Sequence, residues 1–426
     1  MIDTKTAIEK ITNGEFDNLF TDIYIDSSMI DYQKKRYVHA IEQYETIFCP
    51  DKVAIFSAPG RSEVCGNHTD HQHGMVLATS INLDTIAVSA KNNNDVVRFV
   101  SDGYDMITLN INDLEVNDDE AGTTVSLIRG VLRGLKDHGY KIGGFNAYAT
   151  SDVLVGAGLS SSAAFEVVVG TIISGLYNDM KINSVEIAQI SQYAENVFFK
   201  KPCGLMDQMA CSVGGMVNID FKDPTKPIVK KVPTEFEKYD YSLCIVDTKG
   251  DHVDLTDDYA MIPSEMKKVA NFLGEDYLRD CDSNEFYIRL DEIREAVGDR
   301  PVLRAIHFFN EEHNVNNAVS SLENGKFVEF LDAIRKSGNS SFKYLQNVYT
   351  TRDIQHQNIS VALALSESLL RNYGVCRVHG GGFAGTIQAF VKNDFVSNYK
   401  EFINKIFGEN SCHVLKVRKY GGIKVM

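Results

Sequence analysis

A glycine- and serine-rich segment stands between a predicted strand and a nearly all-apolar helix. The segment reads VGAGLSSSAA over residues 155–164, and the helix reads SAAFEVVVGTIISGLY over residues 162–177. Glycine lets the backbone approach a ligand closely, and the unpaired N–H groups at the start of a helix attract an anion. The segment therefore predicts a phosphate-binding loop ahead of a buried helix. A serine-capped helix that follows a glycine turn is the alternative interpretation.

A second segment, GRSEVCGNHTDHQHG at residues 60–74, places an arginine, two carboxylates, two amides and three histidines between glycines. Polar side chains at this density between predicted strands indicate a binding site. Zinc ligation by His68, His71 and His73 with Asp70 is the alternative interpretation, although the spacing matches no common zinc pattern.

Asp207 lies in a third segment, PCGLMDQ at residues 202–208, and is flanked by Met206 and Met209. Burial raises the pKa of a carboxyl and a nearby arginine lowers it, so a carboxylate there is suited to act as a base. Capping of the helix that follows is the alternative role. The chain has no GxxxxGK[ST] phosphate loop and neither of the protein-kinase signatures HRD and DFG.

Periodicity along the chain favours an α+β fold, with helices packed on partly antiparallel sheets. We expect domains at residues 1–220 and 221–426. Helices are predicted within residues 1–50, over 125–138, 162–177 and 184–199, and in the region up to about 372; strands are predicted over 52–60, 75–90, 95–101, 143–153, 215–221 and 241–248, with a pair within 376–392.

The charge balance is acidic: 43 basic against 58 acidic residues give a net charge of −15 over 426 residues. This balance argues against nucleic-acid or anionic-membrane partners. The eight cysteines form no CxxC pair, the N-terminus lacks a signal-peptide pattern, and no apolar run approaches the ~20 residues of a membrane span. We expect a cytoplasmic protein with reduced thiols. No helix is apolar enough on an exposed face to favour a dimer, so a monomer is expected.

Taken together, the three segments resemble the motifs of the GHMP kinases, and most closely those of their galactokinase branch. A late glycine-rich turn completes the resemblance. The four motifs stand in family order across residues 60–385, as GRSEVCGNHTDHQHG, GAGLSSSAA, CGLMDQ and GGGFAG. The resemblance implies a ribosomal-S5-like N-terminal domain, a ferredoxin-like C-terminal domain and a site between them.

The resemblance also implies roles for individual residues. Asp207 would be the catalytic base, and Arg61 would stabilise the transition state. Ser162 and Glu195 would bind Mg²⁺, and Ser101 would contact the nucleotide. The ATP phosphates would lie on Gly156, Ala157, Gly158, Leu159, Ser160, Ser161 and Ser162, and the sugar would contact Asn67, His68, Thr69, Asp70, Gly204 and Tyr259.

The second segment departs from the galactokinase pattern at three positions. Glu63 and Asn67 exchange the residue types usual there, and His71 replaces a tyrosine. Four residues apart in an extended segment, the exchanged pair would project to the same side as Arg61. The exchange is interpreted either as compensating, which keeps one carboxylate and one amide, or as a change of specificity toward a C6 acid.

The expected function is therefore that of an ATP-dependent sugar kinase, with the C1 hydroxyl of galactose as the favoured acceptor. A related sugar is the first alternative, with galacturonate, N-acetylgalactosamine and arabinose as candidates. A non-catalytic sensor that binds galactose and ATP is the second. The region after Tyr259 lacks the paired arginines common in galactokinases.

Overall fold

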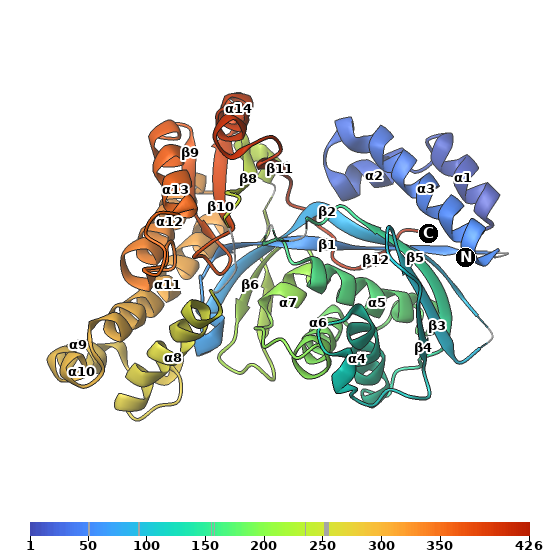
Figure 1. Cartoon of the computed structure of the whole chain (residues 1–426). Coiled ribbons are helices and arrows are strands. Elements are labelled where there is room, and N and C mark those ends of the chain that lie inside the picture. The colour runs from blue at the N-terminus through green and yellow to red at the C-terminus, as the bar shows by residue number, and fades with distance from the viewer. Residues whose placement is uncertain (50–51, 93, 155, 157, 235, 251–254) are drawn as a thin grey trace.

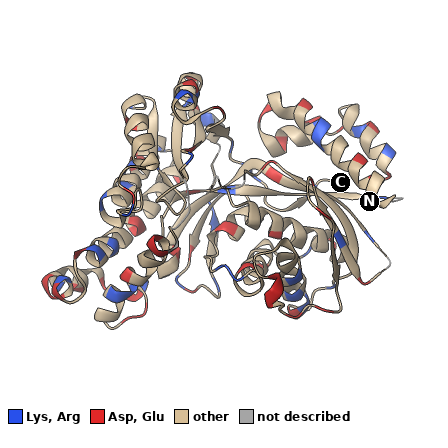
Figure 2. Ribbon diagram, in the orientation of Figure 1, with Lys and Arg blue, Asp and Glu red and all other residues tan. Residues whose placement is uncertain are grey.

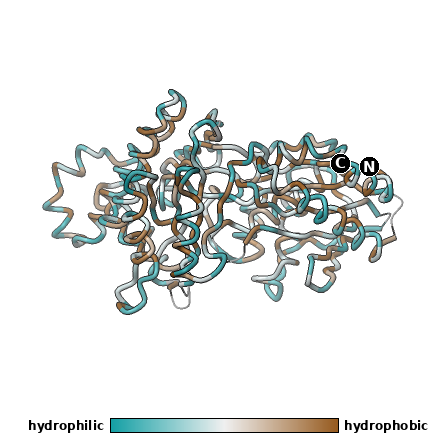
Figure 3. The backbone as a smooth tube through the Cα atoms, turned by 90° about the horizontal axis from the view of Figure 1, so that it is seen from above, coloured by the Kyte–Doolittle hydropathy of each residue, from teal (hydrophilic) through white to brown (hydrophobic). Residues whose placement is uncertain are grey.

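The structure is a computed structural model that describes residues 1–49, 52–92, 94–154, 156, 158–234, 236–250 and 255–426. Val155 and Ala157 of the predicted phosphate loop therefore lie outside the described residues. Seen from above, the molecule is elongated, and hydrophilic segments dominate the end that holds the helices around residues 283–297 (Figure 3).

One large sheet organises the first half of the chain (Figure 1). Its strand order is β12-β1-β2-β5-β3-β4, with β6 and β7 attached to β2, and every pairing is antiparallel except the parallel pair β3–β5. The strands are β1 (Ala54–Cys65), β2 (Met75–Lys91), β3 (Val96–Ser101), β4 (Ile107–Asn110), β5 (Phe145–Ser151), β6 (Met216–Asp220), β7 (Ile228–Lys231) and β12 (Ile423–Lys424).

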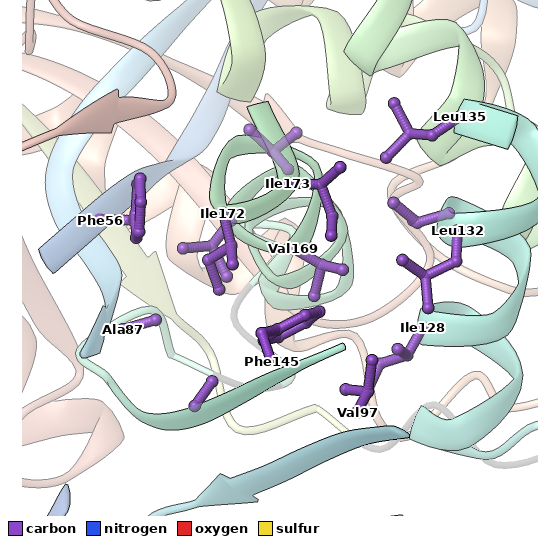
Figure 4. Packing of buried hydrophobic residues seen from close by; sticks show 14 of the residues in the cluster. Phe56, Ala87, Val97, Ile128, Leu132, Leu135, Phe145, Val169, Ile172 and Ile173 are labelled. Carbon is purple, nitrogen blue, oxygen red and sulfur yellow. The ribbon is translucent and has the colours of Figure 1, made fainter. Parts of the chain in front are cut away.

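Helices cover one face of this sheet and build a hydrophobic core against it (Figure 1). The nearly all-apolar helix α5 lies at the centre of this core, as its composition predicts. Its side chains Val169, Ile172 and Ile173 pack among residues of the strands and of α4 (Figure 4). The core therefore fixes the start of α5, where the glycine- and serine-rich loop ends. The helices of this layer are α4 (Thr124–Asp137), α5 (Ser161–Tyr177), α6 (Ser184–Tyr193) and α7 (Met206–Val213).

The opposite face of the sheet carries α1 (Thr4–Thr12), α2 (Asp17–Tyr24) and α3 (Ile30–Phe48) (Figure 1). A fully buried carboxylate, Asp84 of β2, ties this layer to the sheet. Arg36 of α3 and Arg418 approach its two oxygens at 2.7 and 2.9 Å, and Tyr24 of α2 donates to it at 2.9 Å. One buried acid thus connects two helices, the sheet and a segment near the C-terminus.

A second, smaller sheet has the antiparallel order β11-β8-β10-β9. The glycine-rich turn at 380–385 joins β9 to β10, next to the large sheet. The strands are β8 (Tyr241–Asp247), β9 (Gly374–His379), β10 (Thr386–Lys392) and β11 (Cys412–Leu415), and the helices of this half are α8 (Thr256–Phe272), α9 (Ser283–Ile288), α10 (Leu290–Val297), α11 (Asp299–Glu323), α12 (Phe327–Ser340), α13 (Asn358–Leu369) and α14 (Val396–Phe407).

The predicted α+β class is confirmed. The strand predicted to end at residue 60 instead continues to Cys65, through two register shifts that bracket Arg61, and β-bulges of this kind re-aim side chains. The domain division at residue 220 stays a prediction. On the sheets alone, β7 and β12 join the large sheet although both follow that residue.

The distribution of charge and the hydrophobicity of the helices agree with the expectations from composition. Basic and acidic residues are interspersed over the helices of both halves (Figure 2), and none of the described helices is long and apolar enough to cross a membrane. All eight cysteines lie within the described residues as free thiols.

Candidate active site

Arg61 and Asp207 form the centre of the site. The guanidinium of Arg61 donates through Nε and Nη2 to the two carboxylate oxygens of Asp207, at 2.8 and 2.7 Å. Arg61 also donates to the Gly158 carbonyl in the predicted phosphate loop. Asp207 stands in the first turn of α7, whose N-cap residue is Leu205. The arginine therefore joins β1, the loop and α7 at one point.

The pKa of Asp207 reflects two opposed effects. Burial acts to raise the pKa, but the charge and hydrogen bonds of Arg61 and a hydrogen bond from the Ser160 hydroxyl outweigh burial and lower it. The Asp207 side chain retains 32% exposure. The result is an ionised carboxylate that a ligand can still reach, which is what a general base requires.

The predicted phosphate loop has the backbone that its glycines suggest. Gly156, Gly158 and Ser160 all have positive φ, at 80°, 65° and 56°. Gly158 lies against the second sheet, since a Cβ added there would come within 3.1 Å of Thr386 and 3.3 Å of His379. The loop that leads into α5 is thus packed closely against the second sheet.

A hydroxyl and a carboxylate meet at the start of α5. Ser162 donates to Oε1 of the buried Glu195 at 3.2 Å, and Gln208 donates to Oε2 of the same carboxylate at 2.6 Å. Hydroxyl and carboxylate oxygens are the hard ligands that Mg²⁺ prefers, so the two residues fit such an ion. Among the described residues no three His, Cys, Asp or Glu side chains gather as a metal site, so an ion here would take its other ligands from phosphate or water.

The second segment meets α7 through Asp70 and Gly204. A Cβ added to Gly204 would lie 2.0 Å from Oδ2 of Asp70, so only a glycine allows this approach. Asp70 keeps 13% side-chain exposure beside His71. Asp70 and Gly204, both predicted to contact the sugar, are thus brought together next to the segment that carries Asp207.

The glycine-rich turn gathers further residues of the predicted sugar site. The carbonyls of Gly380, Gly381 and Gly382 accept hydrogen bonds from Asn67 at 2.7 Å, from His68 at 2.9 Å and from Tyr259 at 2.8 Å, respectively. Burial, with a contribution from neighbouring His71, lowers the pKa of His68 to about 3, so the ring donates as a neutral imidazole.

Asn67 and Thr69 are brought to this region but not to its surface, contrary to the expectation that they contact a sugar. Both are fully buried. The Thr69 hydroxyl donates within its own turn, and the Asn67 amide donates to Glu63 at 3.0 Å and accepts from Asn347 at 2.7 Å. All their polar atoms have protein partners, so in this structure they position the segment.

Glu63, the other half of the exchange, is buried against Arg377 at 2.8 Å. Glu63 and Asn67 therefore lie in contact, as their spacing predicts, but inside the protein. Ser101 ends β3 beside Ala149 of β5, the strand that leads toward the loop, and none of the hydrogen bonds described for Ser101 reaches the loop.

Of the three histidines of the alternative zinc site, His68 and His71 lie near each other, with ring centroids 5.8 Å apart, but among the described residues no three His, Cys, Asp or Glu side chains could hold a metal ion. The ring of His73 stacks on Tyr277 with centroids 3.6 Å apart, whereas His68 faces the glycine-rich turn. Their separation removes the alternative interpretation of this segment.

Comparison with known proteins agrees with this geometry. A family model described as the GHMP kinases N terminal domain matches residues 126–215, and one described as a galactokinase galactose-binding signature matches residues 42–91. Galactokinases of Limosilactobacillus reuteri and Streptomyces coelicolor are 29% and 28% identical; the alignments cover 86% and 82% of this chain and 93% and 88% of theirs. The chain thus resembles the GHMP kinases N terminal domain over residues 126–215 and resembles galactokinases over most of its length.

The solved structures extend the likeness to the fold. Lactococcus lactis galactokinase, solved in complex with galactose, superposes with a TM-score of 0.76 at 23% identity over 90% of this chain and 98% of its own. A mevalonate kinase gives a TM-score of 0.55 at 17% identity over 85% and 99%. The predicted two-domain GHMP-kinase fold is thus confirmed.

Four residues that shape the site were not predicted: Lys201, Gln208, Arg377 and His379. Gln208 follows Asp207 directly, and Lys201 precedes the same motif in the run KKPCG, so proximity to a recognised motif was their only signal. Arg377 and His379 lie in β9, just before the glycine-rich turn. Their side chains contact Ser62 and Glu63 of β1 because the fold brings the two strands together. The hydrophobic periodicity of the sequence does not reveal such a contact.

Proposed function

We propose that this protein is a GHMP kinase of the galactokinase type, which transfers the γ-phosphoryl group of MgATP to the C1 hydroxyl of galactose. The observation that carries the proposal is the two-pronged Arg61–Asp207 pair, which stands between the predicted phosphate loop and the segment that matches the galactose-binding signature. A base at that junction lies between the two reactants.

The pair accounts for the proton and the charge of the reaction. Asp207 accepts the proton of the attacking hydroxyl, and a fixed general base contributes ~10²–10⁴-fold. Arg61 keeps Asp207 ionised and offsets the negative charge that gathers on the transferring phosphoryl group. Positioning by the loop supplies much of the remaining acceleration.

Ser162 and Glu195 would hold the Mg²⁺ ion. When bound, such an ion neutralises negative charge on the phosphates of ATP. The observation that supports this role is the 3.2 Å hydrogen bond from the Ser162 hydroxyl to the buried carboxylate of Glu195, at the start of α5. The N-terminus of the helix also favours phosphate there.

Asp70, His68, Gly204 and Tyr259 would form the sugar pocket. The Glu63–Asn67 exchange favours galactose over a C6 acid, because the carboxylate is neutralised by Arg377 and the amide is already bonded within the protein. The Asn67 amide is therefore not free to donate to a negative substituent, and the Glu63 carboxylate would repel one. This observation supports the compensating interpretation of the exchange.

A coupled ADP-release assay with MgATP tests the proposal. Galactose, N-acetylgalactosamine, glucose, arabinose and galacturonate are compared at equal concentration. We expect galactose to be turned over fastest. Turnover of another sugar alone would keep the mechanism and replace the substrate, whereas galactose binding without turnover of any sugar would identify a sensor.

The variant Asp207→Asn tests the base. Turnover is expected to fall by ~10²–10⁴-fold or more, because the amide cannot accept the proton. Galactose affinity, measured by calorimetry, is expected to change little. Near-normal turnover in this variant would remove Asp207 from the mechanism.

The cellular setting belongs to the same proposal. We propose a monomeric cytoplasmic enzyme. The net charge of −15 argues against nucleic-acid and anionic-membrane partners, and the eight free thiols support a cytoplasmic setting. Light scattering of the purified protein tests the monomer, and a mass near 95 kDa, twice the 47.5 kDa of the chain, would contradict it.

A further inference from the structure

Lys201 lies against the carboxylate that is predicted to bind the metal. Its Nζ is 2.8 Å from Oε1 of Glu195, the same oxygen that accepts from Ser162. The backbone N–H of Lys201 donates to the Glu195 carbonyl at 3.1 Å. A lysine ammonium thus occupies the oxygen that a divalent ion would need.

The local backbone holds this lysine in place. A π-helical turn spans Ala194–Phe198, and Lys200 after it has a φ of 65°, a left-handed conformation that a residue with a side chain adopts at a cost. The reversal brings Lys201 back over Glu195 and directs Lys200 outward to Asp118 at 3.3 Å. The side chain of Lys201 remains 59% exposed, so its head group is free to move on a flexible stem.

We propose that Lys201 is a phosphate-binding residue of the nucleotide site, which neutralises Glu195 in the empty protein and moves to the triphosphate when the metal ion takes that carboxylate. This inference rests on the proposed function. A divalent ion on Oε1 of Glu195 would repel the ammonium that lies 2.8 Å from the same oxygen, which favours displacement of the lysine. The phosphate oxygens expected on the adjacent loop are the nearest anions that arrive with the ion.

A different role for Lys201 makes the opposite prediction. If the lysine served only as a counter-ion of Glu195, its removal would free the carboxylate, and metal-dependent nucleotide binding would strengthen or stay unchanged. If the lysine contacts phosphate, its removal weakens nucleotide binding. The sign of the change therefore distinguishes the two roles.

The experiment is calorimetric titration of the full chain with a non-hydrolysable ATP analogue, in MgCl₂ and in EDTA. We expect Lys201→Met to bind the analogue in MgCl₂ about 10-fold or more weakly than the wild type, the loss of one charge-assisted contact. Lys201→Arg should recover most of the affinity. Lys200→Met is the matched control, because it removes the same charge from the neighbouring residue, and it should bind like the wild type.

The outcomes separate this inference from the proposed function. Wild-type affinity in Lys201→Met, with unchanged thermal stability, would overturn the role of Lys201 while leaving the kinase intact. Equal losses of affinity in Lys200→Met and Lys201→Met would mean that the effect comes from the net charge of the region, and would overturn the role as well. Failure of the wild type to bind the analogue at all would count against the proposed function itself.

Discussion

The Ser160 hydroxyl contributes, with Arg61, to holding Asp207 as an anion. Removal of the hydroxyl in Ser160→Ala takes away an interaction that lowers the pKa of Asp207, so that pKa rises. Because the base must be ionised, the acidic limb of the pH–rate profile is expected to move to higher pH. The activity loss then grows as the pH falls and is smallest near neutrality. The measurement is kcat/KM for galactose at saturating ATP across the acidic range.

Ser161→Ala is the control for this prediction. Ser161 begins α5 and belongs to the same loop, and no side-chain hydrogen bond to Asp207 is described for it. Its removal should leave the acidic limb where it is, even if ATP binding weakens. If the acidic limbs of the pH–rate profiles of the wild type and Ser160→Ala coincide, Arg61 alone sets the ionisation of Asp207.

Glu63 and Asn67 show how far single residues can be interpreted from sequence. Their spacing of four in an extended segment predicts that the two side chains lie on one side, and they are in contact. The sequence did not indicate that this side faces inward. Burial is set by Arg377, which lies 314 residues away along the chain, and no local pattern records such a partner.

At the scale of elements, the phosphate loop depends on two glycines with different surroundings. Gly158 and Gly156 both have positive φ, which costs about 1–2 kcal/mol for a residue with a Cβ. A Cβ at Gly158 would also press on Thr386 and His379, whereas one at Gly156 meets no described atom within 4 Å. The two alanine variants thus share the strain and differ in packing.

We therefore expect Gly158→Ala to raise the KM for ATP more than Gly156→Ala does. The difference should be roughly fivefold or more, since overpacking costs about 1–3 kcal/mol. Steady-state kinetics with ATP varied at saturating galactose measure it. Equal KM values in the two variants would mean that the contact with the second sheet does not shape the loop.

The elements themselves were predicted unevenly, for physical reasons. The long apolar run of α5 identified a buried helix, because few other structures bury so many consecutive apolar residues. β4 and β7 were missed because each has only four residues and a mostly exposed face, so the alternation that identifies a strand is weak. β1 was cut short at Gly60 because the bulges around Arg61 interrupt its pattern.

At the scale of the whole molecule, Asp84 joins the helical layer to the sheet. Burial acts to raise the pKa of Asp84, but Arg36 and Arg418 outweigh burial and lower it. A carboxyl whose folded pKa is depressed contributes stability above its unfolded pKa of ~3.9, and that contribution is lost as the pH falls through the folded pKa. Stability carried by Asp84 is therefore present at neutral pH and disappears only in strong acid.

Asp84→Asn is expected to destabilise the protein by about 3–5 kcal/mol at neutral pH, since it leaves buried arginine charge without its partner. Its stability should also vary less with pH below ~4 than that of the wild type. Urea denaturation over a pH series measures both effects. Asp152→Asn is the control, because Asp152 also pairs with Arg36 but at 17% exposure, and its loss should be smaller.

The pairing of β12 with β1 has a consequence for biosynthesis. Among the described strands β1 comes first in the chain, yet the edge that β12 pairs stays open until residues 423–424 have been translated. Arg418, which completes the charge balance around Asp84, follows that residue by 334 positions. A nascent chain therefore carries an open strand edge and an incompletely neutralised acid through most of translation. Unpaired strand edges promote association with other chains. We therefore expect the growing polypeptide to bind a chaperone before the active site has formed.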